Sequence, residues 1–183
     1  MPDHRLKPIT PLGRDTAQTD TIGPVTITEN TSMALASLAT RKGRNTDVAK
    51  AAKTLNITLP APGHASDCAL WLGPDQWMVE ALFATHEDTA AHLKATFGDA
   101  ASITEQTDAW VRFDVTGPNL PAMFELLCTL DTRAMQPGHA TRTVIEHLGC
   151  YVTRRADHFS ILGPRSSANS LHHALITAAK SAF

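Results

Sequence analysis

The sequence predicts an α+β fold in which helices cover antiparallel sheets, arranged as two intimately packed lobes. Residues 109–115 alternate apolar and polar side chains, as a strand does when one face is buried and the other is wet. At Gly117 and again at Gly163, a Gly-Pro pair follows a strand-like run and precedes a helical pattern. Between these units, residues 140–159 have the pattern of two further strands. This order favours antiparallel sheet with helices on one face.

The composition suits a folded chain of 183 residues, since 43% of the side chains are apolar and 19% are charged. A formal net charge of -2 gives no attraction to nucleic acid or to an anionic membrane. No apolar run follows the first basic residues, and no stretch of about 18 apolar residues occurs, so we expect a cytoplasmic protein. Cys68, Cys128 and Cys150 are widely spaced, and we expect them to be buried, reduced thiols.

The chain divides into an arm and one domain. Residues 1–24 contain four prolines and neither hydrophobic period, so we expect an extended arm. Residues 25–183 form the predicted domain, with lobes of about 25–107 and 108–183.

The first lobe is predicted to begin with two helices. Residues 32–43 have apolar side chains near helical spacing, and Gly43 closes the pattern. Residues 45–55 repeat the pattern, with Asn45 or Thr46 as the N-cap. A hairpin then follows, because the apolar runs of residues 69–82 are parted by the turn sequence GPDQ, in which glycine tolerates the less common dihedral. Residues 87–98 give a third helical pattern that ends in glycine.

The second lobe contains the same structural unit twice: a strand, a sharp turn (here called a corner) and a helix that covers the sheet. After Gly117, the helix is predicted to start near Pro118 and to present an apolar stripe made of Leu120, Met123, Phe124 and Leu127. After Gly163, Ser166 or Ser167 is the expected cap of a helix whose stripe is Leu171, Ala174, Leu175 and Ala178. Turns between the intervening strands are expected at residues 148–149 and 156–157.

No residue pattern indicates a catalytic, cofactor-binding or metal-binding site. None of the nine histidines has a metal-ligand spacing, and we interpret them as surface or cap residues. Adjacent His172 and His173 would point about 100° apart on a helix. The G-x-S-x-G, G-x-G-x-x-G and Walker patterns are all missing, and the serines of GPRSS fit a helix cap.

A few side chains are candidates for contact with another protein. Trp110 is out of phase with the buried face of its strand, so either its own chain, the N-terminal arm or another subunit covers it. The basic clusters at residues 41–44 and 154–155 fit solvated element ends, or contacts with acidic groups of a partner. The interface candidates are Trp110, Arg154, Arg155 and Phe183.

Four sequence blocks, taken in order, resemble a known family. They are LWLGPDQWMV, TEQTDAWVRFDVTGP, LLCTLDTRAMQPGHATRTVIEHLG and FSILGPRSSANSLHHALI, and the earlier segments ALASLATRKGR and LPAPG also fit. Together they resemble the gamma subunit of heterotetrameric sarcosine oxidase, over residues 69–183. The family also has a fold similar to the folate-binding aminomethyltransferase domain of the glycine cleavage T-protein.

The resemblance implies a role in a four-chain complex. Its alpha, beta, gamma and delta subunits oxidise sarcosine to glycine with oxygen, giving hydrogen peroxide and a one-carbon unit for tetrahydrofolate. The resemblance also implies that FAD, FMN, NAD and tetrahydrofolate bind to the other subunits, and that this chain holds none of them.

At one segment, this sequence differs from the pattern of the distant relatives. Distant relatives carry a carboxylate after an Asn-x-x-Gly-Gly run, whereas this chain has Glu146 in place of the asparagine and one glycine, Gly149. Thr153 or Arg154 stands near the expected acid and cannot replace it. We therefore expect an isolated chain without activity and a structural role in the complex. The alternatives are a free-standing folate-binding protein of the same fold and an unrelated small hydrolase, for which no spacing gives support.

Overall fold

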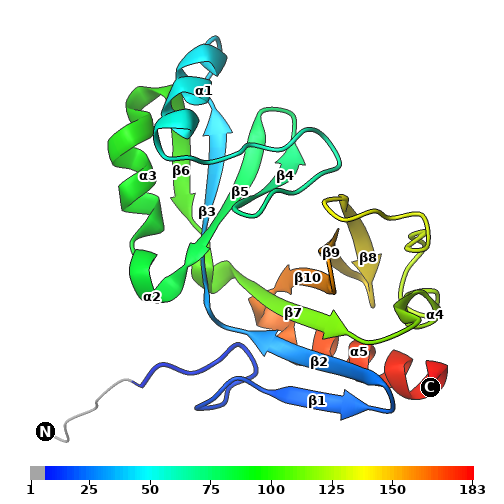
Figure 1. Ribbon diagram of the computed structural model, residues 1–183. Helices are drawn as coiled ribbons and strands as arrows, with labels where there is room; N and C mark the ends of the chain where they lie inside the picture. The colour runs from blue at the N-terminus through cyan, green and yellow to red at the C-terminus, as the bar shows by residue number, and fades with distance from the viewer. Residues whose placement is uncertain (1–6) are drawn as a thin grey trace, which may run out of the picture.

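Two antiparallel sheets form the two lobes of the computed structural model, which describes residues 7–183 (Figure 1). The six-stranded lobe has the strand order β1 (Thr19–Ile22), β2 (Val25–Asn30), β7 (Trp110–Thr116), β10 (Phe159–Pro164), β9 (Leu148–Arg154) and β8 (Ala140–Ile145). The four-stranded lobe has the order β4 (Ala69–Gly73), β5 (Gln76–Leu82), β3 (Met33–Thr40) and β6 (Ala101–Glu105).

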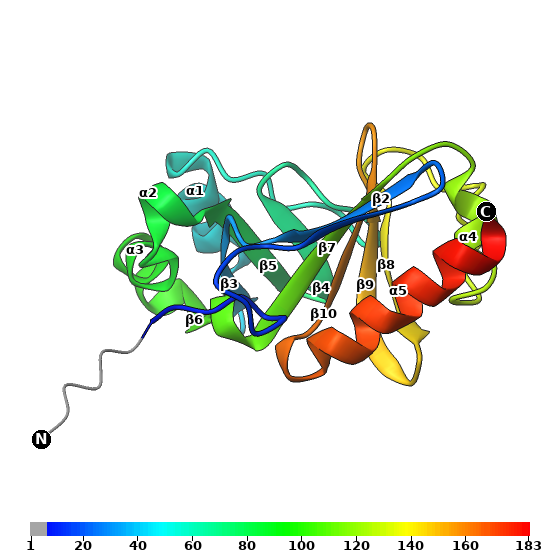
Figure 2. The ribbon, with the colours of Figure 1, turned by 90° about the horizontal axis from the view of Figure 1, so that it is seen from below.

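Each lobe has its own helices, which lie at opposite ends of the molecule (Figure 2). Helix α5 (Ala168–Ala182) runs across one face of the six-stranded sheet, and the short α4 (Leu120–Phe124) lies beside its C-terminal end. Helices α1 (Asn45–Thr54) and α3 (Thr89–Phe97) cover the four-stranded sheet, and α2 (Phe83–His86) directly follows β5. Three 3₁₀ turns complete the elements: η1 (Gly98–Ala100), η2 (Thr107–Ala109) and η3 (Arg165–Ser167).

The apolar interior has three parts. The largest lies between the six-stranded sheet and α5, where the predicted stripe of α5 is buried. A second lies between the four-stranded sheet and its helices. The third joins the two sheets and consists of Leu35, Leu70, Met78, Ala140, Tyr151 and Leu162. The lobes are therefore packed on each other through apolar contact as well as through polar groups.

Several predicted elements are present. The hairpin of β4 and β5, the helix α3 and the strand β7 are confirmed, as are both units of strand, corner and covering helix. Helix α4 is shorter than predicted and begins at Leu120, because Asn119 has a left-handed backbone (φ 51°) and Pro121 occupies the first turn. Leu127 nevertheless packs against the core beyond the end of that helix.

The predicted helix over residues 32–43 is wrong, because this segment forms β3. Strand β3 pairs with β5 on one side and with β6 on the other, so its backbone groups are hydrogen-bonded to two neighbours. Alanine and leucine favour helices locally, but this non-local pairing overrides that preference.

Part of the predicted N-terminal arm is a strand. Strand β1 is the edge of the six-stranded sheet and pairs with β2 around a tight turn at Gly23 (φ 53°). Strand β2 in turn pairs with β7, so residues 25–30 join the six-stranded sheet although they lie in the range assigned to the first lobe. Residues 1–6 of the arm lie outside the described part of the chain.

Two predicted turns are placed differently. The turn between β8 and β9 is formed by Glu146 and His147, both with positive φ (48° and 67°), and not by residues 148–149. In the hairpin of β4 and β5, Asp75 (φ 56°) takes the left-handed position that we assigned to glycine.

The predicted helix caps make no side-chain capping hydrogen bonds. Arg44 occupies the N-cap of α1, and Asn45 instead donates to Asp75 Oδ1 at 3.0 Å. Ser167 occupies the N-cap of α5, and its side chain does not cap the helix.

The three cysteines are free thiols, but only Cys150 is buried. Burial, with a smaller contribution from neighbouring Cys128, raises the pKa of Cys150 to about 11.

Candidate functional site

Polar residues line up on the face of the six-stranded sheet opposite α5. Asp114 of β7 pairs with Ser160 of β10, which pairs with Thr153 of β9. Asn30 of β2 pairs with Arg112 of β7. Cross-strand partners project to the same face, and the alternate residues of β7 are buried beneath α5. These polar side chains therefore project toward the four-stranded lobe.

We predicted a wet face for Arg112 and Asp114, and that prediction is wrong. The exposed fraction is 13% for the Arg112 side chain and 17% for that of Asp114, because Glu80 of the other lobe pairs with Arg112 and side chains of neighbouring strands surround Asp114. The alternation along β7 correctly separates the two faces, but it does not show that a second sheet covers the polar one.

Asp114 lies at the centre of this row. Its Oδ1 accepts hydrogen bonds from Arg112 Nε at 2.7 Å and Ser160 Oγ at 2.6 Å, and its Oδ2 accepts one from Asn30 Nδ2 at 2.7 Å. His158 Nε2 lies 3.6 Å from Oδ1. Burial acts to raise the pKa of Asp114, but the Arg112 charge and these hydrogen bonds outweigh burial and lower the pKa below its usual 3.8.

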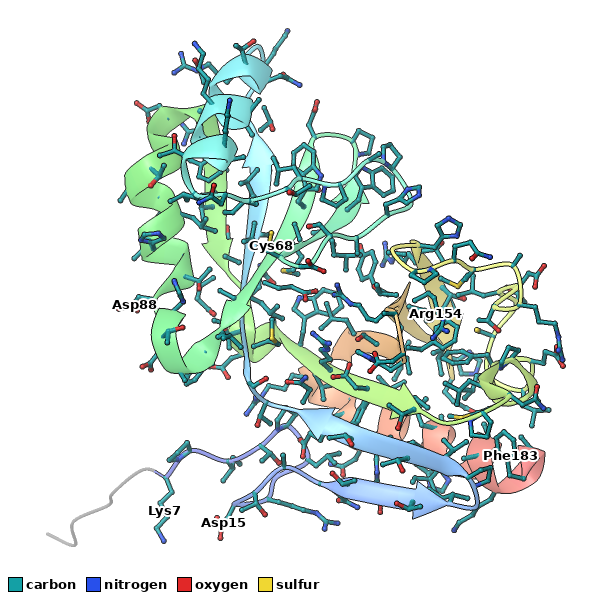
Figure 3. All side chains as sticks on the ribbon, in the orientation of Figure 1. Lys7, Asp15, Cys68, Asp88, Arg154 and Phe183 are labelled. Carbon is teal, nitrogen blue, oxygen red and sulfur yellow. The ribbon has the colours of Figure 1, made fainter. Side chains whose placement is uncertain are left out.

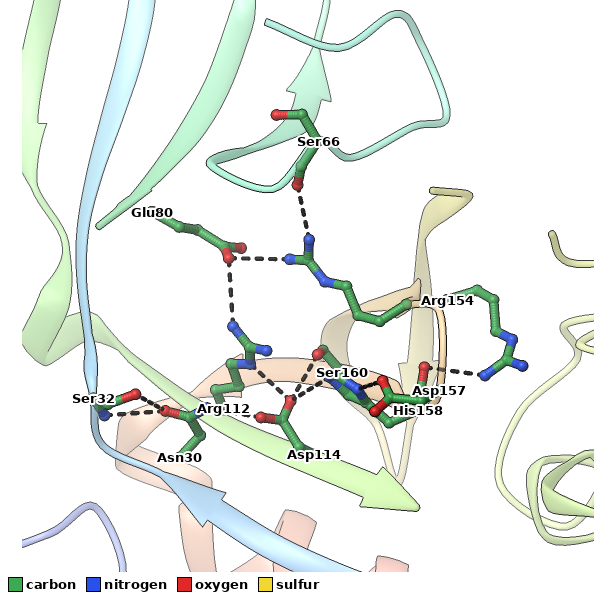
Figure 4. Close-up of polar contacts among 11 residues, drawn as sticks. Asn30, Ser32, Ser66, Glu80, Arg112, Asp114, Arg154, Asp157, His158 and Ser160 are labelled. Atoms are coloured by element: carbon green, nitrogen blue, oxygen red, sulfur yellow. Dashed lines mark hydrogen bonds and ion pairs between the residues drawn. The ribbon is translucent and has the colours of Figure 1, made fainter. Parts of the chain in front are cut away.

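Glu80 of β5 connects this row of polar residues to the four-stranded lobe (Figure 4). Its Oε2 lies 3.4 Å from Arg112 Nη1 and 3.0 Å from Arg155 Nη2, and its side chain is only 6% exposed. Arg155 Nη1 donates to the backbone oxygen of Ser66 at 2.7 Å. We call this set the inter-lobe network: Asn30, Ser66, Glu80, Arg112, Asp114, Arg155 and Ser160. Its two carboxylates and two guanidinium groups balance in formal charge.

A cavity of about 320 Å³ lies beside the network, and we call it the inter-lobe cavity. Glu80 and Arg112 contribute to its polar side. Most of its wall is apolar and consists of Met33, Leu35, Phe83, Trp110 and Leu162, with residues 8–11. The site thus offers apolar surface next to several charged and hydrogen-bonding side chains, among them Glu80 and Arg112.

The N-terminal segment, residues 8–11, is held against this cavity. Arg165 Nη2 donates to the backbone oxygen of Ile9 at 3.0 Å, and Arg165 Nη1 lies 3.4 Å from Asp108 Oδ1. Glu29, only 2% exposed, fixes the following loop by accepting from the amides of Leu12 at 2.9 Å and Gln18 at 3.0 Å. The segment is therefore anchored at both of its ends.

The network has serine and aspartate side chains, and His158 lies beside Asp114, but their order does not form a catalytic triad. In a triad the histidine lies between the nucleophile and the carboxylate, whereas Ser160 Oγ donates directly to Asp114. Ser160 is also only 5% exposed. Asp114 is a weak base because it is held ionised by three donors. The arrangement therefore supports binding or bracing rather than nucleophilic catalysis.

The four interface candidates lie in different surroundings, and Figure 3 labels two of them, Arg154 and Phe183. Trp110 lines the inter-lobe cavity, contacts Tyr151 edge to face and donates from Nε1 to Gln106 at 3.2 Å. Its own chain and the N-terminal segment therefore share in covering it. Arg154 lies over the ring of Phe159 at 4.9 Å, and Arg155 is part of the network. Phe183 is 42% exposed beyond α5. Contact of these residues with a partner stays a prediction.

Glu80 is the site residue that the sequence analysis missed. The available signal is one carboxylate inside the apolar strand sequence WMVEAL. A charged residue at such a position is normally paired when it is buried. Its two arginine partners come from the other lobe, and their proximity could not be derived from spacing.

The positions that depart from the aminomethyl-transfer pattern lie on one hairpin. Glu146 is in the turn, Gly149 and Arg154 are on β9, and Thr153 is 3% exposed on the face that meets the other lobe. Among residues 7–183, no group of three or more His, Cys, Asp or Glu side chains is placed to hold a metal ion.

Comparison with solved structures identifies the fold. A chain of the heterotetrameric sarcosine oxidase from Corynebacterium sp. U-96 superposes with a TM-score of 0.74 and 22% identity, covering 90% of this chain and 88% of that one. The glycine cleavage system aminomethyltransferase T from Bartonella henselae superposes with a TM-score of 0.63 and 15% identity. The chain has an aminomethyltransferase-like fold. The predicted α+β class and its antiparallel sheets with covering helices are confirmed.

The superposition on the Bartonella enzyme covers 87% of this chain but only 50% of that enzyme. This chain therefore spans about half of the length of the Bartonella enzyme. No protein-family model matches the sequence, and no curated protein sequence matches it significantly. Within residues 7–183, none of the helices has the length and apolar character needed to cross a membrane.

Proposed function

We propose that this chain is the gamma subunit of a heterotetrameric sarcosine oxidase and that it braces the complex without catalysing a step. The observation that carries the proposal is the superposition on a chain of such an enzyme over 90% of this chain and 88% of that chain. Such mutual coverage requires two chains of similar length. The ordered sequence blocks over residues 69–183 give independent support.

The inter-lobe network supports the noncatalytic part of the proposal. Glu80, which lines the cavity, and Asp114, the other carboxylate of the network, are both engaged by arginines. A carboxylate held in this way is already stabilised as an anion and has little tendency to take up a proton. The network therefore fixes the two lobes relative to each other.

The proposal assigns the reaction to partner chains. Alpha, beta and delta subunits would carry FAD, FMN, NAD and tetrahydrofolate, and would convert sarcosine to glycine with hydrogen peroxide and a one-carbon unit. The cytoplasmic location expected from the sequence belongs to the same proposal. The isolated chain is predicted to be colourless and inactive.

Affinity purification from the native host tests this proposal. The tagged chain is purified gently, and the mass, the partner chains and the flavin absorbance of the eluted material are recorded. We expect a yellow complex with three further chains that produces peroxide only when sarcosine is added. The same chain expressed alone is the control and should show neither property. Elution of a single colourless chain from the host would contradict the proposal.

A free-standing folate-binding protein is the second candidate. The inter-lobe cavity favours it, because Arg112 and Glu80 offer a donor and an acceptor next to the ring of Trp110. Titration of the isolated chain with tetrahydrofolate distinguishes the two candidates. Saturable binding at micromolar concentrations without any partner would support the second candidate and make the first unnecessary.

A further inference from the structure

The exposed apolar side chains of this chain are unevenly distributed. Six large apolar residues among those described are exposed; two of them line the inter-lobe cavity, and a third is adjacent in the chain to one of these two. Ile9 (55% exposed) and Phe83 (38%) line the cavity, and Leu82 (60%) directly precedes Phe83. We call these three residues the apolar rim. Clustered exposed apolar side chains beside a pocket are typical of a surface that another molecule covers.

The rim and the cavity together fit a polypeptide better than a small molecule. A small ligand inside the cavity would leave the side chain of Leu82 in water, because Leu82 is not among the lining residues. A peptide segment could insert one large side chain into the cavity and lay its neighbours over the rim. Its backbone amide and carbonyl groups would add hydrogen bonds to the polar side chains that line the cavity.

The charges around the cavity indicate the kind of segment. Carboxylates outnumber guanidinium groups three to two among the lining residues, which are Asp15, Glu80, Asp108, Arg112 and Arg165. Glu87 and Asp88 directly follow α2 in the chain and are exposed, and Figure 3 labels Asp88. A basic residue beside the apolar anchor would complement this surface.

We infer that the apolar rim and the inter-lobe cavity dock a segment of a flavin-carrying partner chain that presents a large aromatic or aliphatic residue next to a lysine or arginine. This inference rests on the proposed function, which supplies the partner. The inference adds which surface of this chain makes the contact, which kind of partner side chain enters the cavity, and the charge of the residue beside it. The N-terminal segment takes part through Ile9, which Arg165 fixes in place.

Site-directed photo-crosslinking in the native host tests this inference directly. Benzoylphenylalanine replaces Phe83 in one tagged chain and Leu126 in the control, since Leu126 is 57% exposed and is not among the cavity-lining residues. Irradiation should link residue 83 to a flavin-carrying chain, at a peptide with a large apolar residue adjacent to lysine or arginine. The control should give at least tenfold less of this product. Crosslinking only to a second copy of this chain, or to no flavin-carrying chain, would overturn the inference.

A substitution experiment gives a second readout. The double variant Leu82→Ser/Phe83→Ser should retain at least tenfold less of the flavin-carrying chains than the wild type, and Leu126→Ser should retain them fully. Circular dichroism shows whether each variant is folded. If the double variant does not fold, the crosslinking result alone tests the docking surface. Full retention by a folded double variant would overturn the docking surface while the proposed function stands. Failure of the wild-type chain to capture flavin-carrying chains would overturn both.

Discussion

Gly117 and Gly163 occupy corners that look alike in sequence but require glycine for different reasons. Gly117 has a φ of 140°, and a Cβ there would lie 2.6 Å from the backbone oxygen of Pro24. Gly163 has no unusual φ, but a Cβ there would lie 2.5 Å from Leu171 Cδ2 of α5. The first glycine allows the backbone to turn against β2, and the second lets the covering helix approach the sheet.

The substitution Gly117→Ala should lower the free energy of unfolding by about 3 kcal/mol, because it combines an unfavourable backbone conformation with a clash against main-chain atoms. Gly43→Ala is the matched control, since Gly43 also has a positive φ (77°) but has no atom within 4 Å of the new Cβ. The control should lose about 1 kcal/mol. Urea unfolding of both variants measures the difference, and equal losses would show that the predicted clash has no energetic effect.

At the scale of elements, an aspartate-histidine contact fastens α5 to the edge strand β1. His172 Nε2 lies 2.8 Å from Asp20 Oδ2, and the His172 ring stacks on Phe113 with centroids 5.6 Å apart. Burial acts to raise the pKa of Asp20, but hydrogen bonds from Gln18 and His172 outweigh it and lower the pKa below its usual 3.8. The ionised carboxylate therefore stabilises the fold at pH values above its usual pKa.

Asp20→Asn should lower the free energy of unfolding by about 1 kcal/mol at pH 7. Because the pKa of Asp20 is lower in the folded chain than in the unfolded one, this contribution is lost as the pH falls from 3.8 through the folded-state pKa. Denaturant unfolding of both proteins at pH 7 and near pH 3 measures the difference. Asp99→Asn, at an exposed ion pair, is the control and should have little effect. A penalty for Asp20→Asn that stays constant with pH would contradict this assignment.

The elements also show what a sequence can and cannot reveal. Strand β7 and helix α5 were predictable because their apolar patterns follow the period of the element itself. Strand β3 was not predictable, because its conformation depends on two partner strands far away in sequence. The resemblance of the sequence blocks indicated the fold, whereas the pairing of Glu80 with Arg155 required the structure.

At the scale of the molecule, the inter-lobe network joins two sheets that each have their own helices and core. Glu80 belongs to one lobe and faces two arginines of the other. Removing one charged member of such a buried set leaves the oppositely charged side chains without a partner. The resulting loss in free energy of folding is larger than the stabilisation that the intact set contributes. The network therefore makes the stability of one lobe depend on the presence of the other.

Glu80→Gln should lower the free energy of unfolding by about 3 kcal/mol, because both arginines lose their shared carboxylate. Glu125→Gln is the matched control, since Glu125 pairs with Arg133 on the surface, where the side chains are 55% and 59% exposed. The control should lose less than about 1 kcal/mol. Denaturant titration followed by circular dichroism measures both values. Similar losses for the two variants would show that burial adds nothing to the Glu80 pairs.

The strand order of the six-stranded sheet also has a consequence for how the chain folds. Strands β2 and β7 are neighbours in that sheet, yet the whole four-stranded lobe lies between them in the chain. That lobe is continuous in sequence, and its first and last strands are both paired within it. Once formed, it holds the end of β2 close to the start of β7 and removes most of the loop-closure entropy of joining them. From this topology we expect the inserted lobe to form before β2 and β7 pair in the larger sheet.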